Sequence, residues 1–251
     1  MIENPLKLRV LTVNTHKGFT YFNRKFVLPE LREAVRTVGA DVVFLQEVLG
    51  AHEVFALRHS KKWPEAPHYE FLADDMWHNY AYGRNAVYPE GHHGNALISK
   101  FPIVCHQNVD VSVEFTEKRG LLHCQLDTVD SDITLHAICV HLGLRGGHRK
   151  HQLALLCNLI EALPKNEPVI VAGDFNDWLG KAQSVMAECG LTDVFSAVYG
   201  APPKTFPALF PLLRLDRIYV RGVKDFSPVR LPNRPWSHLS DHAPLAAEII
   251  L

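Results

Sequence analysis

The sequence predicts an α/β protein built as a two-sheet sandwich with flanking helices. Three observations predict this class. Short, continuously apolar runs are typical of buried strands, stretches with helical spacing separate some of them, and the runs end repeatedly in Asn, Glu, His or Asp. With 251 residues, 47% of them hydrophobic, the chain is long enough for one large core, so we expect a single catalytic domain over residues 1–251.

The apolar runs are the expected strands. In chain order they are Leu8–Val13, Asp41–Leu45, Ala96–Ser99, Leu121–Leu126, Ile133–Val140, Pro168–Ala172, Leu215–Val220 and Leu245–Ile250. The fourth and fifth are expected to be neighbours across a turn at Asp130–Asp132. Because buried strands fix the positions of their ends, the polar residues that terminate them are expected to point into one shared cleft.

Two segments show the spacing of helices. In Pro29–Val38 the apolar residues Leu31 and Val35 share one face, and Gly39 follows as a stop signal. The segment Arg149–Leu163 repeats the pattern over a longer stretch. Helices with one apolar face fit the outer layers of a sandwich.

Composition excludes several classes of protein. Charged residues make up 21%, which does not fit a disordered chain, and the formal net charge of -1 gives no global basic field for nucleic acid, although a local basic cleft stays compatible with it. No secretory signal is expected, and no stretch reaches the roughly 20 apolar residues that span a bilayer. The cysteines show no CxxC pair: Cys105, Cys124, Cys139, Cys157 and Cys189. We expect reduced thiols in a cytoplasmic protein.

The segment Val169–Asp177 places an acid and an amide at the end of an apolar strand. Along an extended chain Asp174 and Asn176 point to one side and Phe175 to the other. A carboxylate can polarise water, and an amide can hold a phosphate oxygen or an oxygen-loving metal. Gly, Asp and Asn are also turn residues, so a plain turn explains this segment equally well when it is taken alone.

A second polar cluster, Ser237–Leu245, comes before the last strand. Here Asp241 is expected to reach a metal and His242 to contact the scissile phosphate or its attacking water, with a surface loop as the competing interpretation. Asp216 lies within the apolar strand Leu215–Val220, where a buried carboxylate needs a partner, and His242 is a candidate. Such a pair raises the basicity of the imidazole and fixes its tautomer.

Three further residues have candidate roles. Glu47 ends a buried strand and suits a hard cation such as Mg²⁺, which binds one or two carboxylates together with water and phosphate oxygens. His141 ends another apolar strand, and Arg119 offers a guanidinium to a phosphate oxygen. Taken singly, each has an ordinary explanation: a solvated strand end, a structural histidine and a solvated arginine.

Taken together and in this order, these residues resemble the endonuclease/exonuclease/phosphatase family. The resemblance runs from Leu11 to Leu245, and its most specific segments are Gly-Asp-Phe-Asn and Ser-Asp-His-Ala-Pro-Leu. It implies a four-layer α/β/β/α sandwich with two mostly antiparallel sheets and an active site across the top of both. It also implies a metal-dependent phosphoric ester hydrolase.

The resemblance further implies a role for each matching residue. They are the metal ligands Asn14, Glu47 and Asp241, the phosphate-binding residues Asn14, Arg119 and Asn176, and the catalytic residues His141, Asp174, Asn176, Asp216 and His242. Abasic-site endonucleases of this family have Asp where this chain has His16, and they lack a counterpart of His141. The chain is therefore more similar to the deoxyribonuclease I-like and sphingomyelinase-like branch. The pair His92 and His93 has no assigned role.

The sequence leaves the substrate open. The alternatives are a phospholipid or small phosphorylated molecule, DNA or RNA, and, remotely, no catalysis on the same fold. Leu144–His151 is a small basic cluster that suits phosphates or is simply the solvated start of a helix. Thr205–Leu213, with Thr205 its only polar residue, contacts acyl chains if exposed, although packing into the domain is the favoured interpretation. We favour the phospholipid or small-molecule substrate, a monomer, and Mg²⁺ as cofactor, with Mn²⁺ chemically close.

Overall fold

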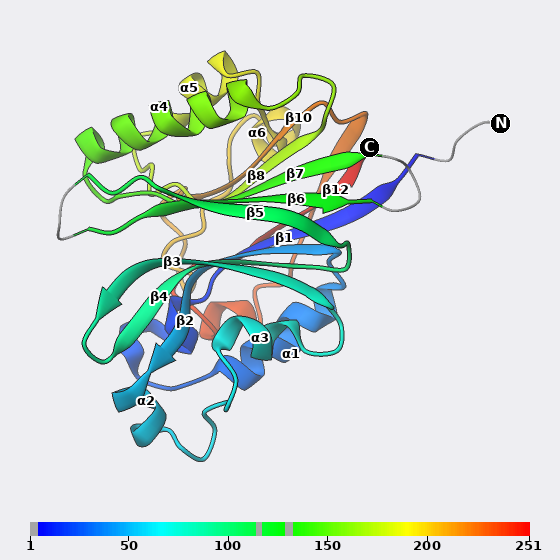
Figure 1. The fold of residues 1–251 in the computed structure, drawn as a ribbon. Coiled ribbons are helices and arrows are strands. Elements are labelled where there is room, and N and C mark those ends of the chain that lie inside the picture. The colour runs from blue at the N-terminus through cyan, green and yellow to red at the C-terminus, as the bar shows by residue number, and fades with distance from the viewer. Residues whose placement is uncertain (1–4, 114–116, 129–132) are drawn as a thin grey trace.

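The computed structural model describes residues 5–113, 117–128 and 133–251. Two six-stranded sheets stack face to face, and helices cover both outer faces (Figure 1). This is the four-layer α/β/β/α sandwich expected from the sequence. The expected turn at Asp130–Asp132 lies outside the described residues.

The first sheet has the strand order β11-β12-β1-β2-β4-β3. These strands are β11 (Asp225–Val229), β12 (Leu245–Ile250), β1 (Lys7–Asn14), β2 (Val42–His52), β4 (Gly91–Ser99) and β3 (Asn79–Tyr88). Only β1 and β2 pair in parallel. The helices on this side are α1 (Leu28–Val38), α2 (Glu53–Arg58) and α3 (His68–Ala73), and α1 and α3 cover the outer face (Figure 1).

The second sheet has the strand order β5-β6-β7-β8-β10-β9. These strands are β5 (Ile103–Asp110), β6 (Gly120–Asp127), β7 (Thr134–His141), β8 (Val169–Asp174), β10 (Asp216–Arg221) and β9 (Thr192–Asp193). Here only β7 and β8 are parallel. The helices α4 (Gly146–Ala162), α5 (Ala182–Glu188) and α6 (Val194–Tyr199) lie on the outer side (Figure 1).

The apolar runs are continuous because the central strands are buried on both faces. On β2, Val42 and Phe44 face the core between the sheets, whereas Val43 and Leu45 face the core beneath α1 and α3. A third apolar core lies between the second sheet and helices α4 and α5. Among the described residues, no helix is both long and apolar enough to cross a bilayer.

Two expectations need correction. The strand expected to end at Leu45 continues to His52, because a bulge in its pairing with β4 absorbs an irregular residue and the ladder then resumes. The cysteines were expected to be reduced, but Cys157 and Cys189 form a disulfide across a Cα–Cα distance of 5.7 Å. The pairing was invisible in the sequence because it depends on the packing of α4 beside the end of α5.

Candidate active site

The polar residues at the strand ends of the first sheet meet at one end of the sandwich. β1 is parallel to β2, and its last residue, Asn14, pairs with Gln46, next to Glu47. Antiparallel β12 begins beside β1 at the same end, and Asp241 and His242 lie just before it. Strand direction and register therefore bring these side chains together.

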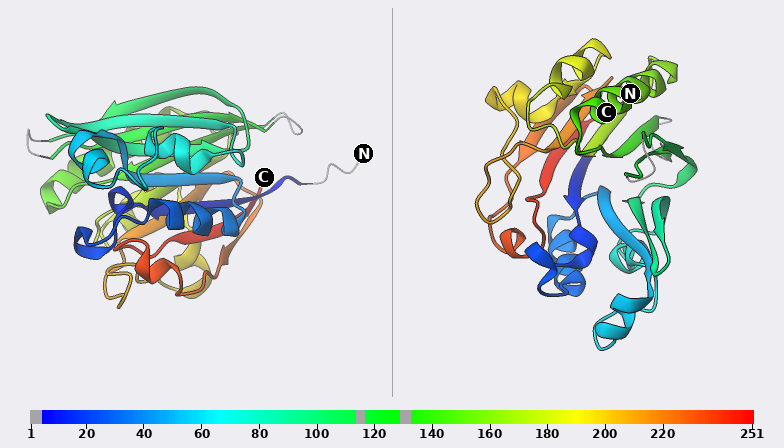
Figure 2. Two further views of the ribbon diagram at one scale, coloured as in Figure 1. Left: turned by 90° about the horizontal axis from the view of Figure 1, so that it is seen from below. Right: turned by 90° about the vertical axis from the view of Figure 1, so that its left-hand side faces the viewer.

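The second sheet contributes at the same end. His141 pairs with Asp174 at the close of the parallel strands β7 and β8, and Asp216 opens antiparallel β10 opposite Asp174. Arg119 lies immediately before β6, which runs antiparallel to β7. The right-hand panel of Figure 2 looks onto this end of the sandwich.

Asp174 is the centre of the cluster and is buried. Its Oδ2 accepts a hydrogen bond from Asn14 Nδ2 at 3.2 Å and lies 3.6 Å from His141 Nε2 and 3.7 Å from His242 Nε2. Its Oδ1 accepts from the backbone N–H of Asn176 at 2.9 Å. Burial raises the pKa of Asp174 to about 7, so this carboxylate can take up a proton near neutrality.

His242 and Asp216 form the buried pair anticipated from the sequence. The distance from His242 Nδ1 to Asp216 Oδ2 is 2.9 Å, and both side chains are almost inaccessible to solvent. Burial opposes the charge on the imidazole, but Asp216 and Asp174 outweigh it and raise the pKa of His242 to about 10. The Asp216 contact fixes Nδ1 as the proton-bearing nitrogen toward the carboxylate and directs Nε2 to Asp174.

Asp174, Asp216 and His242 offer ligand atoms that all lie within 4.8 Å of one another, the one such acid–histidine group found among the described residues. In this group His242 already shares its Nδ1 proton with Asp216, and its Nε2 faces Asp174. The arrangement resembles a proton-transfer relay more than an open cation site.

The carboxylates of Glu47 and Asp241 and the ring of His16 form a second cluster beside it, which we call the acidic pocket. His16 Nδ1 lies 3.2 Å from Asp241 Oδ2 and 3.9 Å from Glu47 Oε2, and Lys17 Nζ lies 3.7 Å from the same Glu47 oxygen. Glu47 has a φ of 54°, in the left-handed region that non-glycine residues rarely occupy. Such strain is retained where the structure needs a side chain in one place, and here it turns the carboxylate into the cleft.

The donor set at this pocket fits a divalent cation. Burial opposes ionisation of Glu47, but the surrounding cations, Lys17 and His16 among them, outweigh it and lower the pKa of Glu47 to about 2. Burial raises the pKa of Asp241, which also faces Glu47. Two facing carboxylates repel one another, and a cation between them removes that repulsion.

Asn14 bridges the two halves of the site. Its Oδ1 accepts from the backbone N–H of His16 at 3.0 Å, while its Nδ2 donates to Asp174. The amide oxygen keeps one lone pair for a further contact. Its backbone carbonyl accepts from the Ser240 hydroxyl at 2.6 Å, which fastens the segment carrying Asp241 to β1.

The expected phosphate-binding residues Arg119 and Asn176 are anchored on one carbonyl. Arg119 Nε donates to the Leu142 oxygen at 3.2 Å, and Asn176 Nδ2 donates to the same oxygen at 2.9 Å. Arg119 Nη2 also donates to Glu117 Oε1 at 3.3 Å. The contact made by Glu117 could not be predicted from the sequence, because an acid close to an arginine is ordinary on a surface.

The sequence also missed two histidines. His16 lies between Glu47 and Asp241, and burial lowers the pKa of His93, on β4, to about 4 in the neighbourhood of Glu47 and Arg119. His93 reaches the site only because β4 pairs with β2, a non-local contact without a sequence signal. His92 instead contacts the Tyr82 hydroxyl at 2.9 Å.

Comparison with known proteins agrees with this geometry. Residues 11–242 match the model of the Endonuclease/Exonuclease/phosphatase family. The chain is 59% identical over 244 residues to the uncharacterized protein YbhP of Escherichia coli K12, and the match covers 97% of this chain and 96% of that protein.

Solved structures share the fold. A solved endonuclease/exonuclease/phosphatase from Beutenbergia cavernae superposes with a TM-score of 0.79 at 23% identity, over 98% of this chain and 72% of that one. A humanized D. rerio TDP2 gives 0.69 at 20% identity, over 97% and 98%.

Proposed function

Because the chain belongs to the endonuclease/exonuclease/phosphatase family, whose members hydrolyse phosphate esters, we propose that it is a divalent-metal-dependent phosphoric ester hydrolase and that residues 1–251 act as one catalytic domain. The observation that carries the proposal is the division of the cleft. An acidic pocket formed by Glu47 and Asp241 lies next to a buried relay of Asp174, His242 and Asp216. Metal-assisted hydrolysis of a phosphate ester uses a cation and a proton acceptor side by side.

A bound cation, held by Glu47, Asp241 and Asn14, supplies Lewis-acid stabilisation of the negative charge on phosphate oxygens. Asp174, with its pKa near neutrality, takes the proton from the attacking water. His242, kept protonated by Asp216, donates to a non-bridging oxygen as charge develops there.

The remaining residues complete the phosphate site. Arg119 and Asn176, both held on the Leu142 carbonyl, stabilise the non-bridging oxygens. His141 protonates the leaving oxygen. Burial and the nearby Arg119 guanidinium hold the pKa of His141 well below its usual range, so this histidine is neutral in the free protein. It acquires its proton only when an anionic phosphate enters the cleft.

The metal is Mg²⁺ or Mn²⁺. The pocket is rich in oxygen, as Mg²⁺ requires, but the buried Nε2 of His16 has no partner and its ring lies against both carboxylates. An imidazole in the donor set favours Mn²⁺. We expect His16→Ala to weaken Mn²⁺ binding about tenfold or more in isothermal titration and Mg²⁺ binding less. Equal losses for the two ions would contradict a ligand role for His16.

We expect the substrate to be a phospholipid or another small phosphorylated molecule, with nucleic acid as the alternative. A non-catalytic protein is disfavoured because every polar residue of the predicted set is present and six of the nine are joined by direct contacts centred on Asp174. We further expect a monomer. The cytoplasmic location expected from the sequence conflicts with the disulfide Cys157–Cys189, because such bonds persist mainly in oxidising compartments.

The direct test is a substrate panel. Purified protein with Mg²⁺ or Mn²⁺ is incubated with bis-p-nitrophenyl phosphate, p-nitrophenyl phosphate, plasmid DNA, RNA and mixed phospholipids. Controls contain EDTA or the Asp174→Ala variant. Hydrolysis of one class that depends on both metal and Asp174 supports the proposal. Turnover by Asp174→Ala at the wild-type rate contradicts the assignment of the proton acceptor.

A further inference from the structure

Large apolar side chains are exposed on four segments beside the cleft. The segments are 16–25, 142–151, 175–184 and 203–214, where 146–151 form the start of α4 and 182–184 the start of α5, and each segment adjoins a strand that carries a site residue. Together they hold 42 of the 251 residues. Among the described residues, eight of the fifteen exposed large hydrophobic side chains belong to them: Tyr21, Phe22, Leu144, Trp178, Leu179, Leu209, Phe210 and Leu212. We call these four segments the rim.

The segment Thr205–Leu213 divides between the two interpretations open from its sequence. Thr205 is buried, and its hydroxyl accepts from the backbone N–H groups of Leu215 and Asp216 at 3.3 Å. The tip does not pack into the domain, since Leu209 is 68% exposed and Phe210 is 71% exposed. The loop base is therefore structural, and its tip is left to contact something outside the molecule.

The rim is strongly basic on a protein that is almost neutral. It contains nine basic residues and one acidic residue, a formal charge of +8 against -1 for the whole chain. The basic residues are Lys17, Arg24, Lys25, Arg145, Arg149, Lys150, Lys181, Lys204 and Arg214. The acidic residue, Asp177, is buried and accepts a hydrogen bond from the backbone of Ala182 at 2.6 Å. The exposed charge of the rim is thus of one sign.

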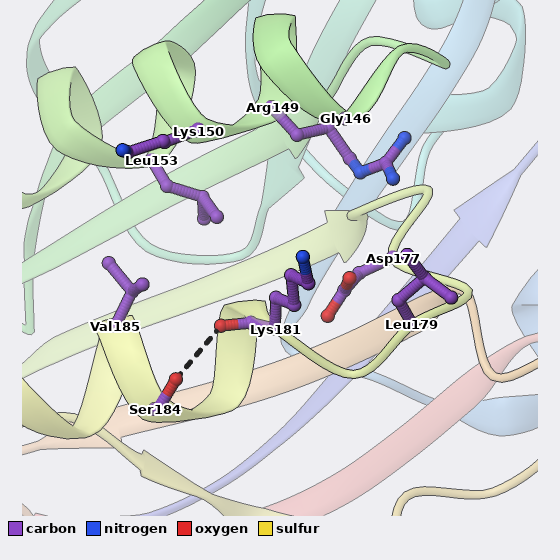
Figure 3. A pocket seen from close by; sticks show the side chains of 9 residues that line it. All are labelled: Gly146, Arg149, Lys150, Leu153, Asp177, Leu179, Lys181, Ser184 and Val185. Atoms are coloured by element: carbon purple, nitrogen blue, oxygen red, sulfur yellow. Dashed lines mark hydrogen bonds between the residues drawn. The ribbon is translucent and has the colours of Figure 1, made fainter.

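A pocket of about 420 Å³ lies within the rim, between α4 and α5. Figure 3 shows Leu153 and Lys181 extending into the space between the two helices. Lys150 lines the same pocket, and Arg149 holds the neighbouring loop by donating from Nη1 to the Leu144 carbonyl at 2.5 Å. Cationic groups above an apolar floor suit a phosphate headgroup attached to a hydrocarbon tail.

We propose that the rim docks the protein on an anionic phospholipid bilayer and presents the cleft to phosphate esters at its surface. Exposed Leu and Phe side chains interspersed with Lys and Arg are typical of segments that bind at a membrane interface. Their apolar side chains enter the boundary between headgroups and acyl chains, while the cations contact anionic headgroups. Nucleic acid matches the charge and the aromatic rings, but it offers no surface that buries Leu144, Leu179, Leu209 and Leu212. A second copy of the chain is disfavoured, because two rims of charge +8 repel one another.

The substrate part of this inference rests on the proposed hydrolase, but bilayer binding does not. The test is sedimentation of the purified full chain with sucrose-loaded vesicles of phosphatidylcholine alone, or with 30% phosphatidylserine, without added metal. We expect binding to the anionic vesicles at least tenfold tighter than to the neutral ones, and weaker binding at 0.5 M NaCl.

Two variants separate the apolar and basic contributions. Leu209→Ser/Phe210→Ser and Lys150→Glu/Lys181→Glu are each expected to reduce binding about tenfold or more. Neither should alter hydrolysis of soluble bis-p-nitrophenyl phosphate by more than twofold. The control is Val104→Ser, because Val104 is 63% exposed at the far end of β5, and its binding should equal that of the wild type.

Failure of docking and failure of catalysis are distinguishable. Absence of sedimentation with anionic vesicles at low salt, binding unchanged in both rim variants, or tighter binding to a fluorescein-labelled single-stranded DNA than to vesicles would each overturn the docking proposal. If the protein binds vesicles but hydrolyses no substrate in the panel, the docking proposal is supported and the proposed hydrolase activity is contradicted.

Discussion

Gly173 provides a sharp test of how the strand register positions Asp174, the proposed catalytic carboxylate. It immediately precedes Asp174 and pairs with Val140 across β7 and β8. Its φ is 148°, and a Cβ added there would lie 1.9 Å from the Val140 carbonyl oxygen, whereas real Cβ contacts below 3.0 Å are essentially unknown. In Gly173→Ala, β7 and β8 must therefore separate by roughly 1 Å at this pair.

The next pair along the strands is His141 with Asp174, so the displacement reaches the centre of the site. A catalytic group misplaced by about 1 Å costs on the order of 10²-fold in rate, and forcing atoms into a packed layer costs about 1–3 kcal/mol of unfolding free energy. We expect Gly173→Ala to lower kcat/KM for bis-p-nitrophenyl phosphate about 100-fold, after normalisation to the folded fraction measured by urea denaturation.

The matched control is Gly39→Ala at the end of α1. Gly39 also has a positive φ, 65°, but an added Cβ meets no atom within 4 Å. This change costs only backbone strain, about 1–2 kcal/mol, and should leave kcat/KM unchanged. A folded Gly173→Ala protein with activity within threefold of the wild type would refute the argument that this strand pair sets the position of Asp174.

Three other predictions concern charge and covalent structure. Asp216→Asn removes the carboxylate that lies 2.9 Å from Nδ1 of His242. We expect kcat, measured by steady-state kinetics, to fall by about 10²–10⁴-fold while the circular dichroism spectrum stays unchanged. A loss of kcat below tenfold would contradict the pairing role of Asp216. The bond between Cys157 and Cys189 closes a loop with a sequence separation of 32. A reductant should therefore lower the unfolding free energy, measured by urea titration, by about 3–4 kcal/mol. An unchanged urea midpoint would indicate that the two thiols are not paired. Burial lowers the pKa of His68 to about 3 in the folded protein, whereas the unfolded chain keeps a pKa of about 6.5. The unfolded state therefore takes up the proton first as the pH falls. About 2 kcal/mol of unfolding free energy should be lost between pH 8 and pH 5. His68→Phe should recover this loss, and an equal loss in variant and wild type would count against it.

The sequence predicted the layer architecture because the central strands carry their signal locally. A strand segment buried on both faces is continuously apolar, as residues 42–45 of β2 and 169–172 of β8 are, and the polar residue that follows it is conspicuous. Asn14, His141 and Asp174 were identified in this way. These residues converge because each sheet contains one pair of parallel strands. The family resemblance implied this convergence, but the local spacing of residues did not.

The missed features depend on contacts between distant segments. Strand β5 is largely exposed and carries no apolar run, so nothing in its own sequence distinguishes it from a loop. His16 lies in a short irregular turn after β1, and only the approach of Glu47 and Asp241 gives it a role. The disulfide has the same origin, since cysteine spacing does not reveal which helices pack together.

The hydrogen bond from Asn14 to Asp174 connects the two sheets at the cleft, and Asn95 donates across the sheets to the Gly120 and Cys139 carbonyls, whereas the rest of the space between the sheets is filled mainly by apolar side chains. Apolar contacts are non-directional and tolerate small shifts, but a hydrogen bond of 3.2 Å does not. The geometry of the cleft therefore depends on how the two sheets are aligned. A slip of one sheet over the other separates the acidic pocket from the proton relay while leaving both sheets intact. Low concentrations of denaturant should consequently abolish the proposed hydrolase activity before they unfold any strand.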